Sequence, residues 1–147
     1  MNLEKLREEL KVDEGVKYEI YLDHLKLPTF GIGHLVLKSD PEYGQPVGTP
    51  VSEDRVNECF AKDVETVLSE CTQLYPNFNV FPEEVQLIIA NMMFNMGRPR
   101  LSKFKGMKAE VDAGDWNRAA IEMVDSKWYQ QVTNRADRLV QRMRSVK

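Results

Sequence analysis

Apolar residues recur at helical spacing over several stretches of the chain, and they alternate with polar residues over one short stretch. The helical pattern covers residues 2–13, 53–74 and 82–96. Residues 16–23 instead alternate apolar and polar positions, which is typical of a half-buried strand. We therefore expect three helices from this part of the chain, with two or three short strands within residues 16–36.

Turn and cap residues mark the ends of these elements. Gly15 follows the first helix, and Ser52 is placed to cap the second. Pro82 and Gly97 frame the third helix, because proline is tolerated at the first helical position and glycine is favoured just past the last. Three more helices are expected, at about 103–113 capped by Ser102, about 116–125 capped by Asp115, and about 134–145 capped by Thr133.

The order of the elements predicts an α+β fold within a single domain of 147 residues. A small N-terminal lobe with a β-hairpin is expected over residues 14–52, and a larger, mainly helical lobe over residues 75–147. The helix over 53–74 is about 30 Å long at the usual helical rise, so it is long enough to join the lobes. The helix over 2–13 is expected to pack on the helical lobe.

Charge divides the chain unevenly. The whole sequence carries 20 basic and 23 acidic side chains, but residues 1–70 have a net charge of −7 and residues 71–147 one of +4. A nucleic-acid binder usually shows a stronger basic excess, so we expect no nucleic-acid partner. The densest basic run is either a solvated face or a surface that attracts a moderately anionic polymer. That run comprises Arg98, Arg100, Lys103, Lys105 and Lys108.

Several kinds of site are not expected. Cys59 and Cys71 lie on one predicted helix about 18 Å apart, too far for a disulfide, so both thiols are expected to be free. The sequence has no metal-ligand spacing, phosphate-binding glycine loop or serine elbow, and we expect neither a metal nor a cofactor. No apolar run approaches membrane-spanning length, and residues 1–12 are too charged for a signal peptide. Neither membrane insertion nor signal-directed export is therefore expected.

Carboxylate chemistry remains. Glu14 ends the first helix beside Asp13, and both the helix end and the neighbouring carboxylate favour the protonated form of Glu14. Asp23 ends the expected strand beside a histidine, with a lysine nearby, where ionisation is easier. Two carboxyl groups in opposite protonation states suit glycosidic cleavage, and the hydroxyl of Thr29 can hold a water. On these residues alone, Glu14 could equally be a solvated helix end.

Asp63 falls on the apolar side of the helix over 53–74. An acid in that position needs a partner, because an unpaired buried charge is costly. His34 is the candidate, and solvent at the edge of the apolar stripe is the alternative.

Four segments of the chain form a recognisable series. They are Glu14 with Asp23, Thr29 and Gly31-Ile-Gly-His34; Phe60-Ala-Lys-Asp63-Val; Ile89-Ala-Asn-Met-Met-Phe94-Asn-Met96-Gly97; and Ser126-Lys-Trp128-Tyr129 with Asn134-Arg135-Ala-Asp-Arg138. In this order they resemble the bacteriophage lysozymes of the T-even type, and the similarity covers most of the sequence.

The resemblance implies specific roles for residues at the matching positions. Glu14 matches the general acid of the family, Asp23 its second carboxylate, and Thr29 the residue that helps to hold the attacking water. Arg135 matches an arginine that forms an ion pair with the acid across the cleft. Such a pair would favour the ionised form of Glu14, so the protonation preference of Glu14 stays open.

Further positions match supporting and substrate-contacting residues. His34 and Asp63 match a salt-bridged pair. Leu35 and Phe94 match residues that contact sugars, and Asn95 falls where the family has a glutamine at the floor of the cleft. The chain departs from the family at two positions in the helical lobe, where Met107 and Glu122 replace a serine and an asparagine that contact substrate.

The function implied is that of a peptidoglycan hydrolase, or muramidase, with its active site between the lobes. It would cleave the β-1,4 bond between N-acetylmuramic acid and N-acetylglucosamine with inversion, bringing about host cell lysis. The implied partner is the peptidoglycan glycan strand, and the protein is expected to be a monomer. It would reach the wall from the host cytoplasm through a separately encoded membrane pore.

Two other functions are compatible with the fold. One is a non-catalytic peptidoglycan-binding module or phage tail structural module, and the other is a chitin-type glycosidase. The presence of Glu14, Asp23 and Thr29 together favours an enzyme, because a pure binder does not need all three residues.

Overall fold

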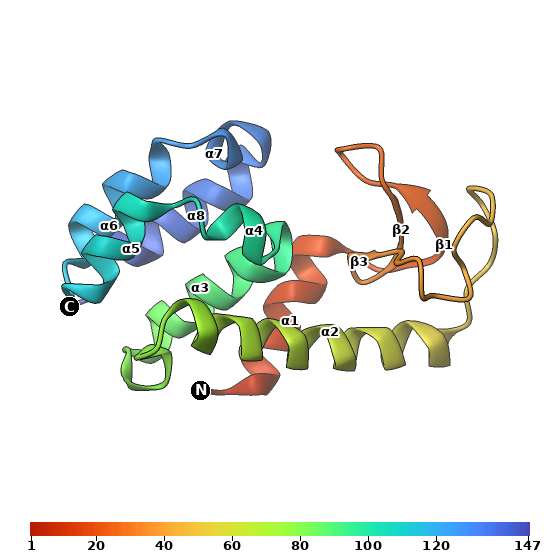
Figure 1. Cartoon of the computed structure of the whole chain (residues 1–147), viewed down its shortest axis with the longest axis horizontal. Helices are drawn as coiled ribbons and strands as arrows, with labels where there is room; N and C mark the ends of the chain where they lie inside the picture. The colour runs from red at the N-terminus through yellow and green to blue at the C-terminus, as the bar shows by residue number, and fades with distance from the viewer. The chain divides into compact units, whose positions relative to one another are not determined.

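A computed structural model describes all 147 residues, and its elements are labelled in Figure 1. The predicted α+β fold is confirmed: a small antiparallel sheet near the N-terminus, a long helix, and a mainly helical C-terminal part. The helices are α1 (Leu3–Glu14), α2 (Glu53–Leu74), α3 (Glu83–Met96), α4 (Arg98–Leu101), α5 (Lys105–Asp112), α6 (Trp116–Val124), α7 (Lys127–Gln131) and α8 (Thr133–Arg144). The strands are β1 (Lys17–Leu22), β2 (Pro28–Gly31) and β3 (His34–Leu35), and a short 3-10 helix, η1, spans Phe78–Val80.

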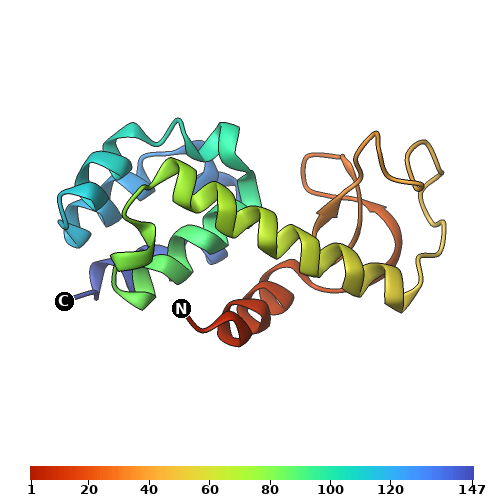
Figure 2. The same cartoon turned by 60° about the horizontal axis from the view of Figure 1, so that its bottom comes forward.

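The chain forms two compact units. Residues 7–66 make up one, here called the β unit, and residues 1–6 with 67–147 make up the other, here called the helical unit. Helices α1 and α2 each contribute residues to both units, and α2 is one continuous helix in both views of the chain (Figures 1 and 2).

The β unit is built on a three-stranded sheet in the order β1-β2-β3, antiparallel throughout. Tyr21 lies opposite Thr29, and Phe30 lies opposite His34. Ile20 and Phe30 are fully buried, whereas Tyr18 and Leu22, two residues to either side of Ile20, are 50% and 49% exposed. The alternating pattern of residues 16–23 therefore predicts the strand correctly, but β1 has no continuous buried face, and its register against β2 shifts between Lys17 and Tyr21.

Helix α3 is the buried centre of the helical unit. Ten of its fourteen residues are buried, in agreement with a sequence that is apolar nearly all round. Helix α6 packs against both α5 and α8, as the ribbons of Figure 1 also show. Asn91 is a polar exception at the centre of α3, and its side chain is fully buried.

Local signals place most helix ends correctly. α1 ends at Glu14 and is followed by Gly15, which has a φ of 73°. α2 has the predicted bounds, and Ser52 Oγ accepts a hydrogen bond from the N–H of Arg55 at 3.2 Å. Gly97 closes α3, and its N–H donates to the carbonyl of Met93. Asp115 caps α6 by accepting from the N–H of Arg118 at 3.0 Å.

Three other end predictions are wrong. Ser102 does not begin the helix predicted over 103–113; it ends α4, a helix that the pattern missed, and its hydroxyl donates to the carbonyl of Pro99. Pro99 provides the reason, because proline in a first turn favours a short helix directly after Gly97. Thr133 is the first residue of α8 and not its cap, and Pro82 precedes α3 instead of beginning it.

Both cysteines are free and buried, as expected. Burial raises the pKa of the Cys59 thiol to about 11 and that of the Cys71 thiol to about 12. Both groups are therefore protonated, unreactive core residues at neutral pH. No helix in the chain combines the length and apolarity that crossing a bilayer requires.

Candidate active site

Glu14 is held at the point where α1 gives way to the sheet. The N–H of Gly15 donates to the carbonyl of Lys11 at 3.0 Å, which closes the helix and turns the chain toward β1. The Glu14 side chain then lies directly against Gly33, where a methyl group would come within 2.6 Å of Glu14 Oε1. Gly33 also has a φ of 61°, so both its backbone conformation and the space that Glu14 occupies favour glycine there.

Asp23 is oriented by the turn that follows β1. Its Oδ1 accepts hydrogen bonds from the N–H groups of Leu25 and Leu27 at 2.8 and 2.9 Å. The backbone closes the same turn, because the N–H of Asp23 donates to the carbonyl of Leu27 and the N–H of Lys26 donates to that of Asp23. Lys26 is the one non-glycine residue with positive φ, at 62°. The tight turn thus fixes one carboxylate oxygen of Asp23.

The Thr29 hydroxyl is attached to that turn. Thr29 is 3% exposed and lies on β2, and its Oγ1 donates to the carbonyl of Leu27 at 2.9 Å. A hydroxyl has one proton to donate and two lone pairs that accept. Because the proton is used by Leu27, the Thr29 oxygen is left as an acceptor. The peptide groups of Leu27 therefore position both Asp23 and Thr29.

Tyr21 is a further residue near the proposed catalytic residues. It lies opposite Thr29 in the sheet. Burial raises the pKa of the Tyr21 phenol above its usual value, and the carboxylates of Glu14 and Asp23 raise it further. Both carboxyl groups are therefore close enough to act on one phenol. Sequence reasoning missed Tyr21, although its place two residues before Asp23 puts both side chains on one face of the strand.

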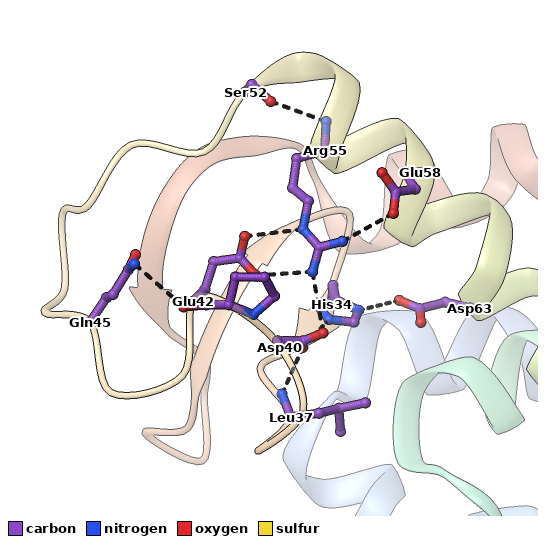
Figure 3. A network of polar contacts seen from close by, with 10 residues as sticks. His34, Leu37, Asp40, Glu42, Gln45, Ser52, Arg55, Glu58 and Asp63 are labelled. Carbon is purple, nitrogen blue, oxygen red and sulfur yellow. Dashed lines mark hydrogen bonds and ion pairs between the residues drawn. The ribbon is translucent and has the colours of Figure 1, made fainter.

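The predicted contact between His34 and Asp63 is present, and a second acid contacts the other ring nitrogen of His34 (Figure 3). His34 Nδ1 lies 2.6 Å from Asp63 Oδ2, and His34 Nε2 lies 2.8 Å from Asp40 Oδ2. Burial by itself lowers the pKa of His34, but the hydrogen bonds to Asp63 and Asp40 outweigh it and raise the pKa above its usual value. The imidazole is thus held between two carboxylates that favour its charged form.

Arg55 extends this group of residues along α2 (Figure 3). Its guanidinium contacts Glu42 at 3.0 Å, Asp40 at 3.3 Å and Glu58 at 3.2 Å. The hydrogen bonds from Arg55 hold the pKa of Glu42 below its usual value. Burial opposes ionisation of Asp40, but the N–H of Leu37, together with His34 and Arg55, lowers its pKa as well. The loop that follows β3 is therefore attached to α2 by ionic contacts.

The remaining predicted residues divide between the two units. Leu35 lies on β3 and is 44% exposed. In the helical unit, Arg135 is buried on α8, and its Nε donates to Asn91 Oδ1 at 2.9 Å. Asn95 Oδ1 accepts from the indole N–H of Trp128 at 2.7 Å, and Phe94 beside it is half-buried.

Two findings in the helical unit go beyond the sequence prediction. Asn91 positions Arg135, and its signal in the sequence is a single amide within an otherwise apolar helix, a residue type that is seldom buried without a partner. Met107 is 1% exposed, so it is part of the core and presents no surface to a substrate. Glu122 is exposed, and its carboxylate lies against Gly106.

The class of protein follows from this arrangement. A small sheet with one carboxylate at the end of the preceding helix, a second in the turn after β1 and a threonine on β2, followed by a long helix and a helical unit, defines a lysozyme-like α+β fold. The chain belongs to the phage lysozyme family, whose model matches residues 11–145. The resemblance inferred from the sequence is thus confirmed, and the family places the protein among the glycoside hydrolases.

Individual relatives differ in how much of their length the chain covers. The chain is 30% identical to probable T4-type lysozyme 2 of Dictyostelium discoideum, over 92% of the chain and 91% of that protein. It is 29% identical to the pre-baseplate central spike protein Gp5 of Enterobacteria phage T4, over 91% of the chain but only 26% of that protein. It is also 29% identical to the peptidoglycan hydrolase gp36 of Pseudomonas phage phiKMV, over 93% of the chain and 15% of that protein.

Proposed function

We propose that the protein is a peptidoglycan hydrolase that cleaves the β-1,4 bond between N-acetylmuramic acid and N-acetylglucosamine with inversion. Family membership supports the reaction class, and similarity to a T4-type lysozyme over most of both chains supports the substrate. The observation that carries the proposal is the turn after β1. There one residue, Leu27, orients the carboxylate of Asp23 and the hydroxyl of Thr29 together.

Glu14 is proposed as the proton donor. As the bond between the anomeric carbon and the bridging oxygen breaks, that oxygen takes the carboxyl proton of Glu14 and leaves as an alcohol. Gly33 has no side chain, which leaves room for the Glu14 carboxyl group beside the sheet.

Asp23 and Thr29 are proposed to hold the attacking water. Thr29 Oγ1 accepts one hydrogen of the water, because its own proton is bound to the carbonyl of Leu27. Asp23 Oδ1 is occupied by two N–H donors, so Oδ2 accepts the other hydrogen and takes it as a proton when the water oxygen bonds to the anomeric carbon. Water then enters opposite the leaving group, which inverts the anomeric configuration.

Leu35 is proposed to contact a sugar ring, since it is an exposed apolar residue directly across the sheet from Thr29. For the helical unit, the roles that the resemblance implies for Phe94, Asn95 and Arg135 stay predictions.

The decisive experiment replaces the proton donor. Glu14→Gln should keep the fold and lose about 10²–10⁴-fold in the rate of reducing-end release from purified peptidoglycan, the usual contribution of general acid catalysis. Glu8→Gln is the matched control, because it makes the same change at an exposed position of the same helix. Activity of Glu14→Gln within twofold of the control would refute the assignment.

Two further readouts separate the alternatives. Inversion predicts that the first product released from a β-linked substrate is the α-anomer, as followed by NMR, and an initial β-anomer would mean retention. Faster release of reducing ends from chitin than from peptidoglycan would identify a chitin-type glycosidase. Binding to peptidoglycan without any release would identify a non-catalytic module.

A further inference from the structure

Four cations follow one another closely along the sequence of the helical unit without an acid among them. They are here called the cationic strip, and they consist of Arg98, Arg100, Lys103 and Lys105. Arg98 and Arg100 belong to α4, Lys103 lies in the turn that follows it, and Lys105 is the first residue of α5. The sequence has no aspartate or glutamate between Glu84 and Glu110. The segment therefore has a local positive charge that its own neighbours in sequence do not offset.

The fold does not neutralise the strip either. The guanidinium of Arg98 donates to Gln73 Oε1, and that of Arg100 donates to Gln131 Oε1 at 2.9 Å. Amide oxygens carry no net charge, so both arginines keep theirs. Lys103 and Lys105 are exposed and form no ion pair. The adjacent cation behaves differently, because Lys108 lies 2.5 Å from Asp112 and for that reason is not part of the strip.

Three other arginines of the chain are paired with carboxylates. Arg55 contacts two glutamates and an aspartate, Arg118 lies 3.6 Å from Asp115, and Arg142 pairs with Glu84. Arg98 and Arg100 differ from these three arginines, because their side-chain contacts are with uncharged glutamines. The glutamine contacts restrict the arginine side chains without neutralising their charge. Because these side chains are already restricted, they lose less conformational entropy when an anion binds.

We propose that the cationic strip binds a phosphodiester polymer of the cell envelope. Guanidinium groups match the geometry of phosphate oxygens and can bind them in a bidentate manner. Charges distributed over α4 and the start of α5 suit a repeating anion better than a single one. The choice of an envelope polymer, as opposed to another polyanion, rests on the proposed function, whereas the binding of phosphodiester chains does not.

One acid borders the strip and provides an independent test. The carboxylate of Glu122 lies against Gly106, the residue that follows Lys105. Glu122 should therefore repel a polyanion that lies along the strip, and its removal should strengthen binding. A solvated face with no ligand would show no such response.

The experiment measures binding of a fluorescent poly(glycerol phosphate) chain to the full protein at low and moderate salt. The double variant Lys103→Gln/Lys105→Gln should bind at least tenfold more weakly than the parent protein at low salt, and its affinity should depend less on salt. Neither lysine makes a contact that the fold needs. The matched control is Lys38→Gln/Lys62→Gln, which removes the same charge from exposed sites of the β unit and should change affinity less than twofold.

Two more variants test the chemistry of the ligand. Glu122→Gln should bind the polymer about two- to fivefold more tightly, an effect on the scale of one exposed charge. Arg98→Lys/Arg100→Lys keeps the charge but loses the planar guanidinium, and it should bind more weakly than the parent. The lysine and arginine variants of the strip and the control variant should release reducing ends at the parental rate from peptidoglycan that has been stripped of phosphate polymers.

Several outcomes would overturn the proposal. They are equal losses in the strip and control variants, no binding at low salt, and tighter binding of a polyuronate, which carries carboxylates. Tighter binding of duplex DNA at equal charge would assign the strip to nucleic acid instead. Failure of hydrolysis alone would refute the proposed function and leave the binding result intact.

Discussion

The two units of the protein carry net charges of opposite sign, and a different kind of contact stabilises each unit internally. The β unit has 7 basic and 13 acidic side chains, a net −6, whereas the helical unit has 13 basic and 10 acidic, a net +3. In the β unit, a histidine between two carboxylates and an arginine among three acids attach the loop after β3 to α2. The helical unit relies instead on α3, which is buried over most of its length.

The two units should therefore respond differently to pH. The carboxylates proposed for catalysis lie in the unit whose structure depends on ionised groups, so the conditions that change their protonation also act on the fold around them. The helical unit has an apolar core that pH changes little. Perturbing each unit in turn should therefore give effects of different size and different pH dependence.

The largest effect on stability is expected in the helical unit. Leu87→Ala removes a fully buried side chain of α3 and should cost about 2–5 kcal/mol in the free energy of unfolding. Urea unfolding followed by tryptophan fluorescence measures it, because Trp116 and Trp128 both lie in this unit. The control Val80→Ala changes a residue that is 81% exposed and should shift stability by less than about 0.5 kcal/mol. A loss below 1 kcal/mol for Leu87→Ala would contradict a tightly packed α3.

The next effect is expected in the β unit. Asp63→Asn removes one of the two carboxylates on His34 and should lower the free energy of unfolding by about 1–3 kcal/mol, the usual range for a hydrogen bond to a charged group. Thermal unfolding of the variant measures the loss. Glu65→Gln, an exposed change on the same helix, should have almost no effect. Equal melting temperatures for both variants would show that Asp63 is merely solvated.

The contact between Asp63 and His34 was predictable, and most of the surrounding group was not. An acid on the apolar stripe of a helix must find a partner, so a local pattern indicated a distant contact. Asp40 and Glu42 lie in a loop rich in proline and glycine, where no periodicity shows which side chains turn inward. Their partner Arg55 looks like an ordinary exposed helix residue.

Local patterns in the sequence also predicted helix bounds better than contacts between distant residues in the rest of the chain. The bounds of α2 and the ends of α1 and α3 follow from stripes, caps and glycines, which are local signals. The short helices α4 and α7 lack a full apolar period and were missed. Asn91 and Arg135 are 44 residues apart, and only the packing of α3 brings the amide to the guanidinium.

The pH dependence of the β unit is the third prediction. The raised pKa of His34 adds stability that is fully present below about pH 6.5, its unfolded value, and that is lost as pH rises through the folded pKa. The lowered pKa values of Asp40 and Glu42 add stability above about pH 4–4.5 that is lost on acidification. The β unit should therefore be most stable between these limits.

NMR signals of the β unit, followed during urea unfolding at several pH values, measure this dependence. His34→Gln should remove the loss of stability on the alkaline side and weaken the acid side only in part, because Leu37 and Arg55 still lower the pKa of Asp40 and Arg55 that of Glu42. Tryptophan fluorescence should show a weaker alkaline response in the helical unit. An identical alkaline loss in the parent protein and in His34→Gln would show that another group is responsible.

A smaller effect, of opposite sign, is expected at the turn that holds Asp23. Lys26 has a left-handed backbone conformation, with a φ of 62°, which costs a side-chain-bearing residue about 1–2 kcal/mol. Lys26→Gly should remove this strain and, after the entropy cost of glycine, raise the free energy of unfolding by about 1 kcal/mol or slightly less. Lys38→Gly, in a loop without positive φ at that residue, should lower it. Destabilisation by Lys26→Gly would mean that the lysine side chain itself supports the turn.

The smallest effect is expected in the helical unit, at a buried polar group. The variant tests whether this group contributes to the stability of the fold. Tyr75 is fully buried, and its hydroxyl has no hydrogen-bond partner. Tyr75→Phe removes that desolvated hydroxyl and keeps the ring, including its position 5.2 Å from the Nζ of Lys108. The melting temperature should rise slightly, by the equivalent of about 0.5 kcal/mol, while Tyr43→Phe at a site that is 56% exposed should leave it unchanged. A clear loss of stability in Tyr75→Phe would show that the hydroxyl is bonded in solution, through a buried water, and that the helical unit depends on a polar contact of its own.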